Sequence, residues 1–468
     1  MEIFGCTHAP AKDQVIIPLM AVTPSSLQAI SKQSPFKAAW LGQQSFNAKS
    51  GEVCIVPSSE GSIDQVLFGW HKSSSMGDFA KVVQALPVGH YRLILDHDCS
   101  DQLADFAQIW GLCCYEFTRY RLARKSLPTL VIDDLSKQHR FALNRILNAT
   151  YQVRNWINTP AEDFGPEELS DLCHALGNRY KAHVHEVVGD DLLKENYPLI
   201  HMVGRASTRQ PRMICLRWGK ESDPAVALVG KGVCFDTGGI QVKPHAAMQT
   251  MKKDMGGAAH MIALAEMIMA SKLSIRLSLW IGAVDNSVSG RSYLPGDVAT
   301  ARNGMTIEVG HTDAEGRLVL ADMLSAAAED KPSCIVDYAT LTGAQRVALG
   351  MEIPAVFASN QHMLEQLLRL GQQHNDPIWS LPLYQPYTSQ LESDIADISS
   401  TGRTPYGGAI LAALFLQHFV PEQTDWLHID ASCFNTHARP GYPRGGEAMA
   451  LEALFALLQA RVQRQDAS

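Results

Sequence analysis

The stretch Ala225–Gly239, which reads AVALVGKGVCFDTGG, decides the fold. Its first five residues, Ala225–Val229, are all apolar and predict a buried strand of a parallel sheet. Lys231 follows this run and Asp236 comes five residues later, so both are expected at the carboxyl end of the strand. Open α/β sheets place their ligand crevices at that edge. The stretch therefore predicts an α/β fold with a site beside the end of this strand.

Apolar runs and helical patterns alternate along the rest of the C-terminal part. The expected strands are Met213–Leu216, Ile275–Ala283, Ile335–Tyr338 and Trp426–Ile429, and the expected helices are Gly256–Met269, Arg317–Ala328, Gly407–Phe419 and Glu447–Leu458. Strands separated by helices indicate a mixed, mostly parallel central sheet flanked by helices. The fold class of this part is therefore α/β.

The first ~135 residues read as a smaller α/β domain without a dense cluster of ionisable residues. Its expected strands are Val15–Pro18, Val53–Pro57, Tyr91–Leu95 and Leu130–Ile132, with a helix at Asp105–Tyr115. A helical stripe then runs from Arg140 to Ile157 and stops at Asn158-Thr159-Pro160, because proline disfavours a helical residue before it. We predict an N-terminal domain at residues 1–138, a connecting helix at 139–160 and a C-terminal domain at 161–468.

Composition limits the class of protein. The 468 residues are 46% hydrophobic and 19% charged, which is typical of a globular chain, and the length suggests two or more domains. Forty Lys and Arg stand against 48 Asp and Glu, a net charge of −8, and no basic run occurs. Nucleic acid is therefore not expected as a partner.

The sequence contains no targeting or membrane signal that we recognise. The start of the chain lacks a basic region followed by an apolar run, and no apolar stretch approaches the roughly 18 residues of a membrane span. The 10 cysteines are scattered without a C-x-x-C pair, which is typical of reduced thiols. We therefore expect a cytoplasmic protein that does not enter a membrane.

Phosphate binding by the glycine-rich stretch is disfavoured. A dinucleotide loop starting at Gly230 would need a third glycine at position 235, where Phe235 stands, and no P-loop pattern occurs.

The alternation of Ile240–Pro244 predicts a short strand with Gln241 and Lys243 on one face. Taken alone, Lys243 is a solvated surface lysine by default.

Four carboxylates occur on segments that this topology brings to one sheet edge: Asp236, Asp254, Asp313 and Glu315. Two of them also have a purely structural interpretation, since Asp254 could cap a helix and Thr312-x-x-Glu315 forms a capping box. Two adjacent carboxylates are costly unless a cation or a proton lies between them. Hard oxygen ligands suit divalent ions, and shared carboxylates suit a pair of them. The scattered histidines have no zinc-site spacing and are expected on the surface or in the core.

These segments resemble the leucyl (cytosol) aminopeptidases. The resemblance rests on Gly230–Gly239, Lys243, Met251–Met255 and Thr312–Leu318, strengthened by Asn158–Pro160, Pro295–Asp297 and Ala339–Ala344, and it runs from about residue 140 to the end. It implies a catalytic domain at 161–468 that removes N-terminal residues, leucine and other largely apolar ones, from peptides. A water bridging two divalent metal ions, zinc or manganese, would be the nucleophile.

The resemblance also implies a role for each site residue. Lys231, Asp236, Asp254 and Glu315 would hold one ion, and Asp236, Asp313 and Glu315 the other. Lys243 and Arg317 would be catalytic, with bicarbonate bound at Arg317, and Met251, Thr340 and Gly343 would line the side-chain pocket. A homohexamer is implied as well. Some relatives bind DNA, so an added or replacing binding role is the alternative, although every expected ligand is present.

The chain departs from the family pattern at three places. His311 stands where asparagine is usual, and Cys234 and Thr237 replace threonine and serine. Gly445–Ala448 differs from the better-known G-x-T-G pattern, which puts the shape of the pocket and its side-chain preference in question.

Overall fold

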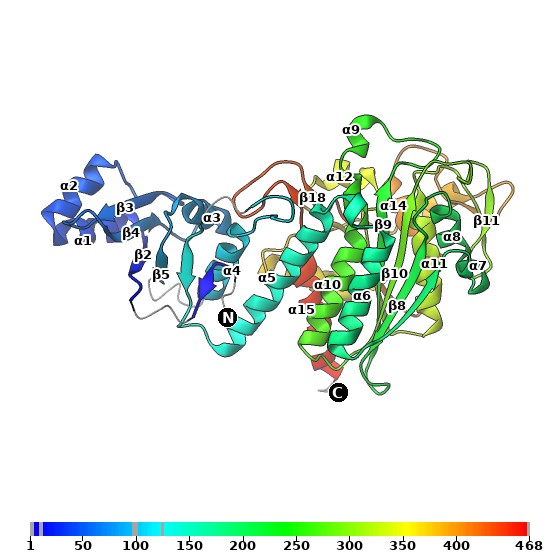
Figure 1. Ribbon diagram of the computed structural model, residues 1–468, viewed down its shortest axis with the longest axis horizontal. Coiled ribbons are helices and arrows are strands. Elements are labelled where there is room, and N and C mark those ends of the chain that lie inside the picture. Colours follow the sequence, from blue (N-terminus) through cyan, green and yellow to red (C-terminus); the bar gives the residue numbers. More distant parts are fainter. Residues whose placement is uncertain (1–3, 9–12, 96–101, 123–125, 466–468) are drawn as a thin grey trace. The chain divides into compact units, whose positions relative to one another are not determined.

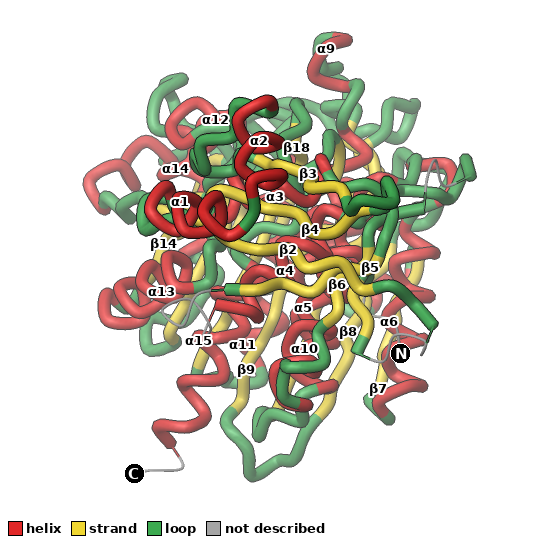
Figure 2. The backbone as a smooth tube through the Cα atoms, turned by 90° about the vertical axis from the view of Figure 1, so that its left-hand side faces the viewer, coloured by secondary structure: helices red, strands yellow, loops and turns green. Residues whose placement is uncertain are grey.

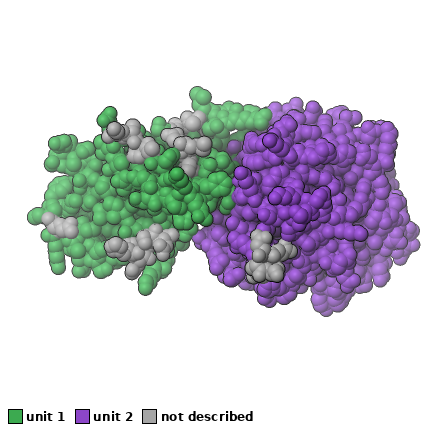
Figure 3. Space-filling model, turned by 90° about the horizontal axis from the view of Figure 1, so that it is seen from below, with its two compact units in different colours: residues 1–151, 437–444 green, residues 152–436, 445–468 purple. Residues whose placement is uncertain are grey.

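The structure is a computed structural model that describes residues 4–8, 13–95, 102–122 and 126–465. It divides into two compact units, coloured separately in Figure 3. Unit 1 is Met1–Tyr151 with His437–Arg444, and unit 2 is Gln152–Thr436 with Gly445–Ser468. The division falls within the helix α5 (Lys137–Asn158), which covers the helical stripe that the sequence predicts.

Unit 1 is built on a six-stranded sheet in the order β1-β6-β5-β2-β4-β3. Its strands are β1 (Cys6–Thr7), β2 (Ile16–Val22), β3 (Val53–Pro57), β4 (Ile63–Gly69), β5 (His90–Ile94) and β6 (Thr129–Val131). Its helices before α5 are α1 (Pro24–Gln33), α2 (Pro35–Gln43), α3 (Met76–Ala85) and α4 (Leu103–Cys113). Neighbouring strands are parallel except the pair β3–β4, so the predicted small α/β domain is confirmed.

Unit 2 contains an eight-stranded sheet in the order β15-β14-β17-β13-β9-β10-β8-β7. Its strands are β7 (His183–Val188), β8 (Arg212–Trp218), β9 (Ala225–Asp236), β10 (Arg276–Asn286), β13 (Cys334–Ala339), β14 (Ala355–Ala358), β15 (Trp379–Ser380) and β17 (Asp425–Asp430). The four central strands β17, β13, β9 and β10 are parallel, and the antiparallel pairs lie toward the edges. The predicted mixed, mostly parallel sheet is confirmed.

Helices cover both faces of this sheet, as Figure 1 shows. One face carries α6 (Pro166–Tyr180), α10 (Gly256–Ala270) and α15 (Leu451–Gln465), and the other carries α8 (Pro198–Gly204), α11 (Glu315–Glu329) and α14 (Gly408–Gln417). Because the central strands are buried on both faces, their sequences are continuously apolar rather than alternating.

Further helices and strands complete unit 2, and several of them are labelled in Figure 2. The helices are η2 (Ala161–Asp163), α7 (Asp191–Lys194), α9 (His245–Met248), η3 (Met251–Met255), α12 (Gly343–Leu349), α13 (Gln361–Gln373) and η4 (Gln385–Leu391). The strands are β11 (Val298–Thr300), β12 (Thr306–Glu308), β16 (Ile398–Ser399), β18 (Phe434–Asn435) and β19 (Gly445–Gly446). Across the described residues, no helix is long and apolar enough to cross a membrane.

Two local predictions near the site are wrong. The strand β9 does not end at Val229 but continues to Asp236, so Lys231 lies within the strand and Asp236 at its end. The backbone of β10 pairs with these additional residues up to Asn286, opposite Asp236, and this pairing extends the strand past the apolar run. Ile240–Pro244, predicted as a strand, is a loop.

The helix α10 can lie close to the sheet because it begins with two glycines, Gly256 and Gly257. A Cβ on Gly257 would lie 2.0 Å from the Tyr338 carbonyl oxygen of β13 and 3.0 Å from the Lys231 nitrogen of β9. Since both neighbours are backbone atoms of central strands, neither can move without disturbing the sheet.

We predict that Gly257→Ala lowers the free energy of unfolding by about 1–3 kcal/mol, the usual cost of overpacking a core. The matched control is Gly290→Ala, because a Cβ there meets nothing within 4 Å. Urea unfolding of both variants followed by tryptophan fluorescence measures the effect. Equal midpoints for the two variants would contradict the close helix–sheet approach.

Candidate metal and catalytic site

One pocket of about 690 Å³ lies where the central strands end. All ten residues predicted from the sequence line it: Lys231, Asp236, Lys243, Met251, Asp254, Asp313, Glu315, Arg317, Thr340 and Gly343. They come from β9, the loop after it, η3, the turn before α11 with the first residues of that helix, and the segment from the end of β13 to the start of α12 (Gly343–Leu349). The fold therefore brings together residues that are more than 100 positions apart in the sequence.

Lys231 holds four of these segments together. Its ammonium nitrogen lies 2.7 Å from Asp254 Oδ2 and 2.9 Å from Glu315 Oε1, and it donates a hydrogen bond of 2.9 Å to the Thr340 carbonyl. The side chain is almost fully buried. Burial alone would lower the pKa of Lys231, but the charges of Asp254 and Glu315 raise it above its ordinary value. This lysine is a charged partner of two carboxylates rather than a surface residue.

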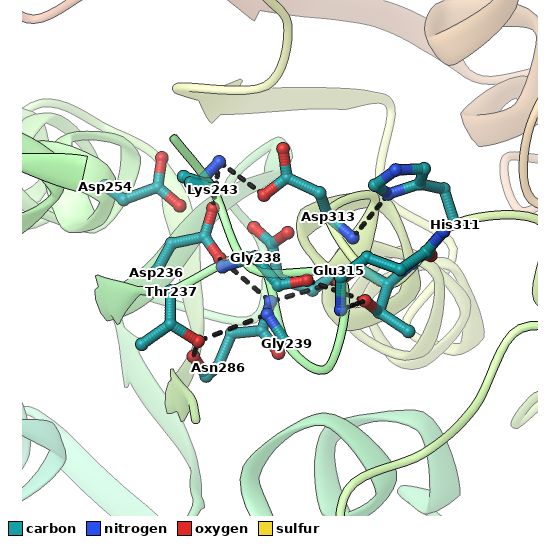
Figure 4. Close-up of polar contacts among 12 residues, drawn as sticks. Asp236, Thr237, Gly238, Gly239, Lys243, Asp254, Asn286, His311, Asp313 and Glu315 are labelled. Atoms are coloured by element: carbon teal, nitrogen blue, oxygen red, sulfur yellow. Dashed lines mark hydrogen bonds and ion pairs between the residues drawn. The ribbon is translucent and has the colours of Figure 1, made fainter. Parts of the chain in front are cut away.

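Asp236 is oriented by neighbours from two segments, the loop after β9 and the end of β10. Its Oδ1 accepts hydrogen bonds of 2.8 Å from the Gly238 nitrogen and 2.8 Å from Asn286 Nδ2. Its Oδ2 lies 2.6 Å from the Lys243 ammonium, which also contacts Asp313 (Figure 4). Lys243 is therefore an ion-pair partner in the site, and the reading of a solvated surface lysine is wrong. The sequence analysis missed Asn286, which no motif marks.

Three carboxylates converge closely enough to share a cation. One oxygen each from Asp236, Asp313 and Glu315 lies within 4.8 Å of the others. Burial and Asp254 raise the pKa of Asp236 to about 6. Burial and Asp236 raise the pKa of Glu315 well above its ordinary value. Both pKa values are raised, as expected for carboxylates that lie close together. A bound cation would reduce the repulsion between their charges.

The donor set fits a divalent cation. Glu315 Oε2 is buried and accepts no hydrogen bond from the described residues. Asp254 Oδ2 and Asp313 Oδ1 face lysine ammonium groups but likewise lack a hydrogen bond of good geometry. Buried oxygens with free lone pairs are the ligands that hard cations prefer. Asp254 lies outside the three-carboxylate group and joins it through Lys231.

The segment after β13 positions Asp254 and is itself fixed from β17. Thr340 Oγ1 donates a hydrogen bond of 2.7 Å to Asp254 Oδ1. Asp430 accepts hydrogen bonds from the Leu341 and Thr342 nitrogens at 2.9 and 3.2 Å. The alternative reading of Asp254 as a helix cap is wrong, because α10 begins at Gly256 without a side-chain cap. Asp430 was missed because only the parallel pairing of β13 and β17 brings it here.

The turn before α11 is held by Thr312, but not as a capping box. The helix begins at Glu315, and its cap residue, Ala314, makes no side-chain hydrogen bond. Thr312 Oγ1 instead donates a hydrogen bond of 2.6 Å to the Gly238 carbonyl and accepts one of 3.1 Å from the Gln241 nitrogen. The predicted capping box is therefore wrong, and Thr312 joins the loop after β9 to the turn that presents Asp313.

His311 has a local role in the same turn. Its Nδ1 accepts a hydrogen bond of 3.0 Å from the Asp313 nitrogen (Figure 4). An asparagine side-chain oxygen can make the same contact with a backbone N–H two residues on. The departure at His311 therefore keeps a turn-stabilising acceptor.

Arg317 is buried in the first turn of α11. It donates a hydrogen bond of 2.5 Å to the Ser400 carbonyl, and its guanidinium carbon lies 5.9 Å from the centre of the Phe415 ring. Burial lowers its pKa to about 10. Its Nε has no hydrogen-bond partner among the described residues. The side chain thus retains a free donor beside the N-terminus of a helix, a suitable place for an anion.

The departure at Gly445–Ala448 has a structural explanation. Glu447 is buried and lies 2.9 Å from the Arg154 guanidinium, and it accepts a hydrogen bond of 2.6 Å from Asn435 Nδ2. None of the four residues is among those that line the pocket. Glu447 therefore packs against Arg154 and Asn435 and is not one of the residues that line the pocket.

We predict that Thr312→Val destabilises the site loop, because it leaves the Gly238 carbonyl and the Gln241 nitrogen without partners. Each buried orphan costs about 1–3 kcal/mol. Hydrogen exchange of residues 237–244 should accelerate in Thr312→Val, while Thr312→Ser, which keeps the hydroxyl, should behave as the wild type. Unchanged exchange in Thr312→Val would mean that this threonine does not hold the loop.

Comparisons with known families and proteins identify relatives of this chain. A model of the cytosol aminopeptidase family, catalytic domain, matches residues 151–455, and a model of the M17 aminopeptidase N-terminal domain matches residues 17–133. The chain is 40% identical over 366 residues to Peptidase B from Pectobacterium carotovorum subsp. carotovorum (strain PC1). That alignment covers 76% of this chain and 82% of the relative.

Solved structures of related proteins match this chain over nearly its whole length. A cytosol aminopeptidase from Coxiella burnetii superimposes with a TM-score of 0.92 at 40% identity, covering 98% of this chain and 99% of that one. The bottromycin maturation enzyme BotP in complex with Mn gives a TM-score of 0.83 at 28% identity, covering 95% and 99%. The chain belongs to the cytosol aminopeptidase family, whose members are metal-dependent hydrolases.

Proposed function

We propose that this aminopeptidase removes N-terminal residues from peptides at a centre of two divalent metal ions. The observation that carries the proposal is the convergence of three carboxylates, Asp236, Asp313 and Glu315, within 4.8 Å in the pocket. Buried oxygens without hydrogen bonds support it, because they require a cation or a proton. The manganese in the structure of BotP is consistent with such a site in this chain.

Five residues would hold the two ions. Lys231, Asp236, Asp254 and Glu315 would bind one, and Asp236, Asp313 and Glu315 the other. Two dications, zinc or manganese, would supply Lewis acidity and a water of lowered pKa between them. Lys231 would then bind a metal ion through its neutral amine. It could lose its proton because the metal ions would neutralise Asp254 and Glu315 in its place.

Lys243 and Arg317 would act on the substrate and on a bound anion. The Lys243 ammonium is held between Asp236 and Asp313, where it can donate to the carbonyl oxygen that gains charge during hydrolysis. Arg317 has a free Nε donor at the start of α11. We assign bicarbonate to that donor, where it would accept the proton of the attacking water.

The assembly and location of the enzyme belong to the same proposal. The family resemblance implies a homohexamer. Large exposed apolar side chains next to pocket-lining residues support burial against another copy, since Val347 is 90% and Tyr406 80% exposed. Light scattering on the full chain after size exclusion tests the hexamer. The described cysteines are all free, which suits the cytoplasm.

We predict that Glu315→Gln abolishes hydrolysis of aminoacyl amides and weakens metal binding at least tenfold, because both ions would lose a shared charged ligand. Titration with Mn²⁺ followed by calorimetry measures binding independently of activity. Glu365→Gln on the exposed side of α13 is the matched control, with the same change in charge. Undiminished Mn²⁺ binding by Glu315→Gln would exclude the proposed ligand set.

We predict that Arg317→Met lowers kcat about 10²-fold, the contribution typical of a general base. In carbonate-free buffer the wild type should lose activity and regain it on addition of bicarbonate, whereas the variant should not respond. A variant that responds to bicarbonate as the wild type does would place the anion elsewhere.

A further inference from the structure

Lys231 and Asp236 point to the same face of β9, although they are five residues apart in the sequence. The Lys231 ammonium contacts Glu315 of α11, and an oxygen of Asp236 lies within 4.8 Å of one from Glu315. Side chains of a regular strand alternate between its two faces, so residues separated by an odd number lie on opposite faces. A regular strand would therefore turn Asp236 away from the other carboxylates.

One extra residue in β9 reverses this alternation. Val233 lies opposite Val284 of β10, but the next pair along the two strands is Phe235 with Asp285, so the pairing skips Cys234. Such a β-bulge moves every later side chain of the strand to the other face. The bulge at Cys234 is therefore what aims the carboxylate at the end of β9 into the site.

Arg209 holds the bulge from the face opposite the site. Asn286 points into the site, so its neighbour Asp285 on β10 points to the other face. There Arg209 makes a two-pronged ion pair with Asp285, with Nε and Nη2 each 2.7 Å from one carboxylate oxygen. Ser207 Oγ donates a further hydrogen bond of 2.9 Å to the buried Asp285. Burial raises the pKa of the Cys234 thiol, and the charges of Asp285 and Arg209 act on the same thiol.

The end of β10 connects this ion pair to the metal ligand. Asn286 Nδ2 donates a hydrogen bond of 2.8 Å to Asp236 Oδ1 (Figure 4). The Asn286 carbonyl accepts a hydrogen bond of 3.0 Å from the Thr237 nitrogen, so side chain and backbone both fix the strand end. Because Asp285 and Asn286 are adjacent, the contact that Arg209 makes on one face fixes the amide that orients Asp236 on the other.

We propose that Arg209 is a positioning residue of the metal centre, acting on Asp236 through Asp285 and the bulge at Cys234. The proposal rests on the proposed function, in which Asp236 binds both ions. Arg209 is not among the residues that line the pocket, so it acts without touching metal or substrate. Arg209 also donates a hydrogen bond to the Ala161 carbonyl of η2. A purely structural role, in which Arg209 only fastens η2, is the alternative that the test must exclude.

The test titrates Mn²⁺ into the metal-stripped full chain and measures the dissociation constant by calorimetry. Changes to groups that orient a metal ligand typically weaken metal binding 10–100-fold. We expect Arg209→Met to weaken Mn²⁺ binding about tenfold, at a temperature where thermal unfolding shows the variant to be folded. A merely structural role would lower the unfolding temperature and leave the Mn²⁺ affinity of the folded protein unchanged, and that result would overturn the proposal.

A double variant tests the route through the end of β10. If Arg209 acts through Asn286, then Arg209→Met combined with Asn286→Ala should bind Mn²⁺ about as weakly as Asn286→Ala alone, because both changes release the same carboxylate. If the weakening in the double variant equals the product of the two separate effects, Arg209 and Asn286 act independently, and the proposed route is wrong.

Arg212→Met is the matched control. Arg212 lies on β8 opposite Ala283 of β10, and its Nη1 is 2.6 Å from Glu186, so the same substitution breaks a similar ion pair away from the bulge. Its Mn²⁺ affinity should equal that of the wild type, and equal weakening in both variants would overturn the proposal.

Arg209→Lys keeps the charge but loses the two-pronged contact, so it tests the proposal if Arg209→Met does not fold. Mn²⁺ binding weakened about threefold or more in Arg209→Lys would support the proposal, and wild-type affinity would overturn it. A wild type that binds Mn²⁺ as tightly as Arg209→Met refutes only the role of Arg209. A wild type that binds no Mn²⁺ would contradict the proposed function itself.

Discussion

The buried ammonium of Lys231 is the constraint on which the rest of unit 2 depends. A charge in the middle of a central strand is tolerated only if oxygens surround it, and they come from three other segments: Asp254 of η3, Glu315 of α11 and the Thr340 carbonyl after β13. The close approach of α10 at Gly257 serves the same end, since it brings η3 to the strand. Stability and site geometry therefore depend on the same contacts.

Strands of the sheet fix the orientation of the site residues more precisely than the loops alone would. A register shift between Val284 and Asp285 brings Asn286 opposite Asp236, where its amide orients the carboxylate. Asp430 on β17 acts similarly on the segment after β13. Each chemically active side chain thus receives at least one hydrogen bond or ion pair from a neighbouring strand or turn, which reduces the reorganisation needed for catalysis.

Periodicity and motif spacing could predict the two α/β units, most central elements and the charged residues of the pocket, whereas Met251, Thr340 and Gly343 followed only from the family resemblance. Their individual roles stay predictions. The errors have a common cause: local patterns were overridden by long-range partners. Ile240–Pro244 alternates like a strand, but Gln241 bonds with Thr312 instead. Asn286 and Asp430 escaped notice because no motif marks them, and only the pairing of neighbouring strands brings them to the site.

The ion pair between Arg154 and Glu447 has a consequence for synthesis on the ribosome. Its partners are separated by 293 positions, and both are buried. Until Glu447 has been synthesised, Arg154 cannot form this buried ion pair, so unit 2 cannot complete the packing around it from the N-terminal side onward. Burial of Arg154 therefore depends on a residue 293 positions further along the chain.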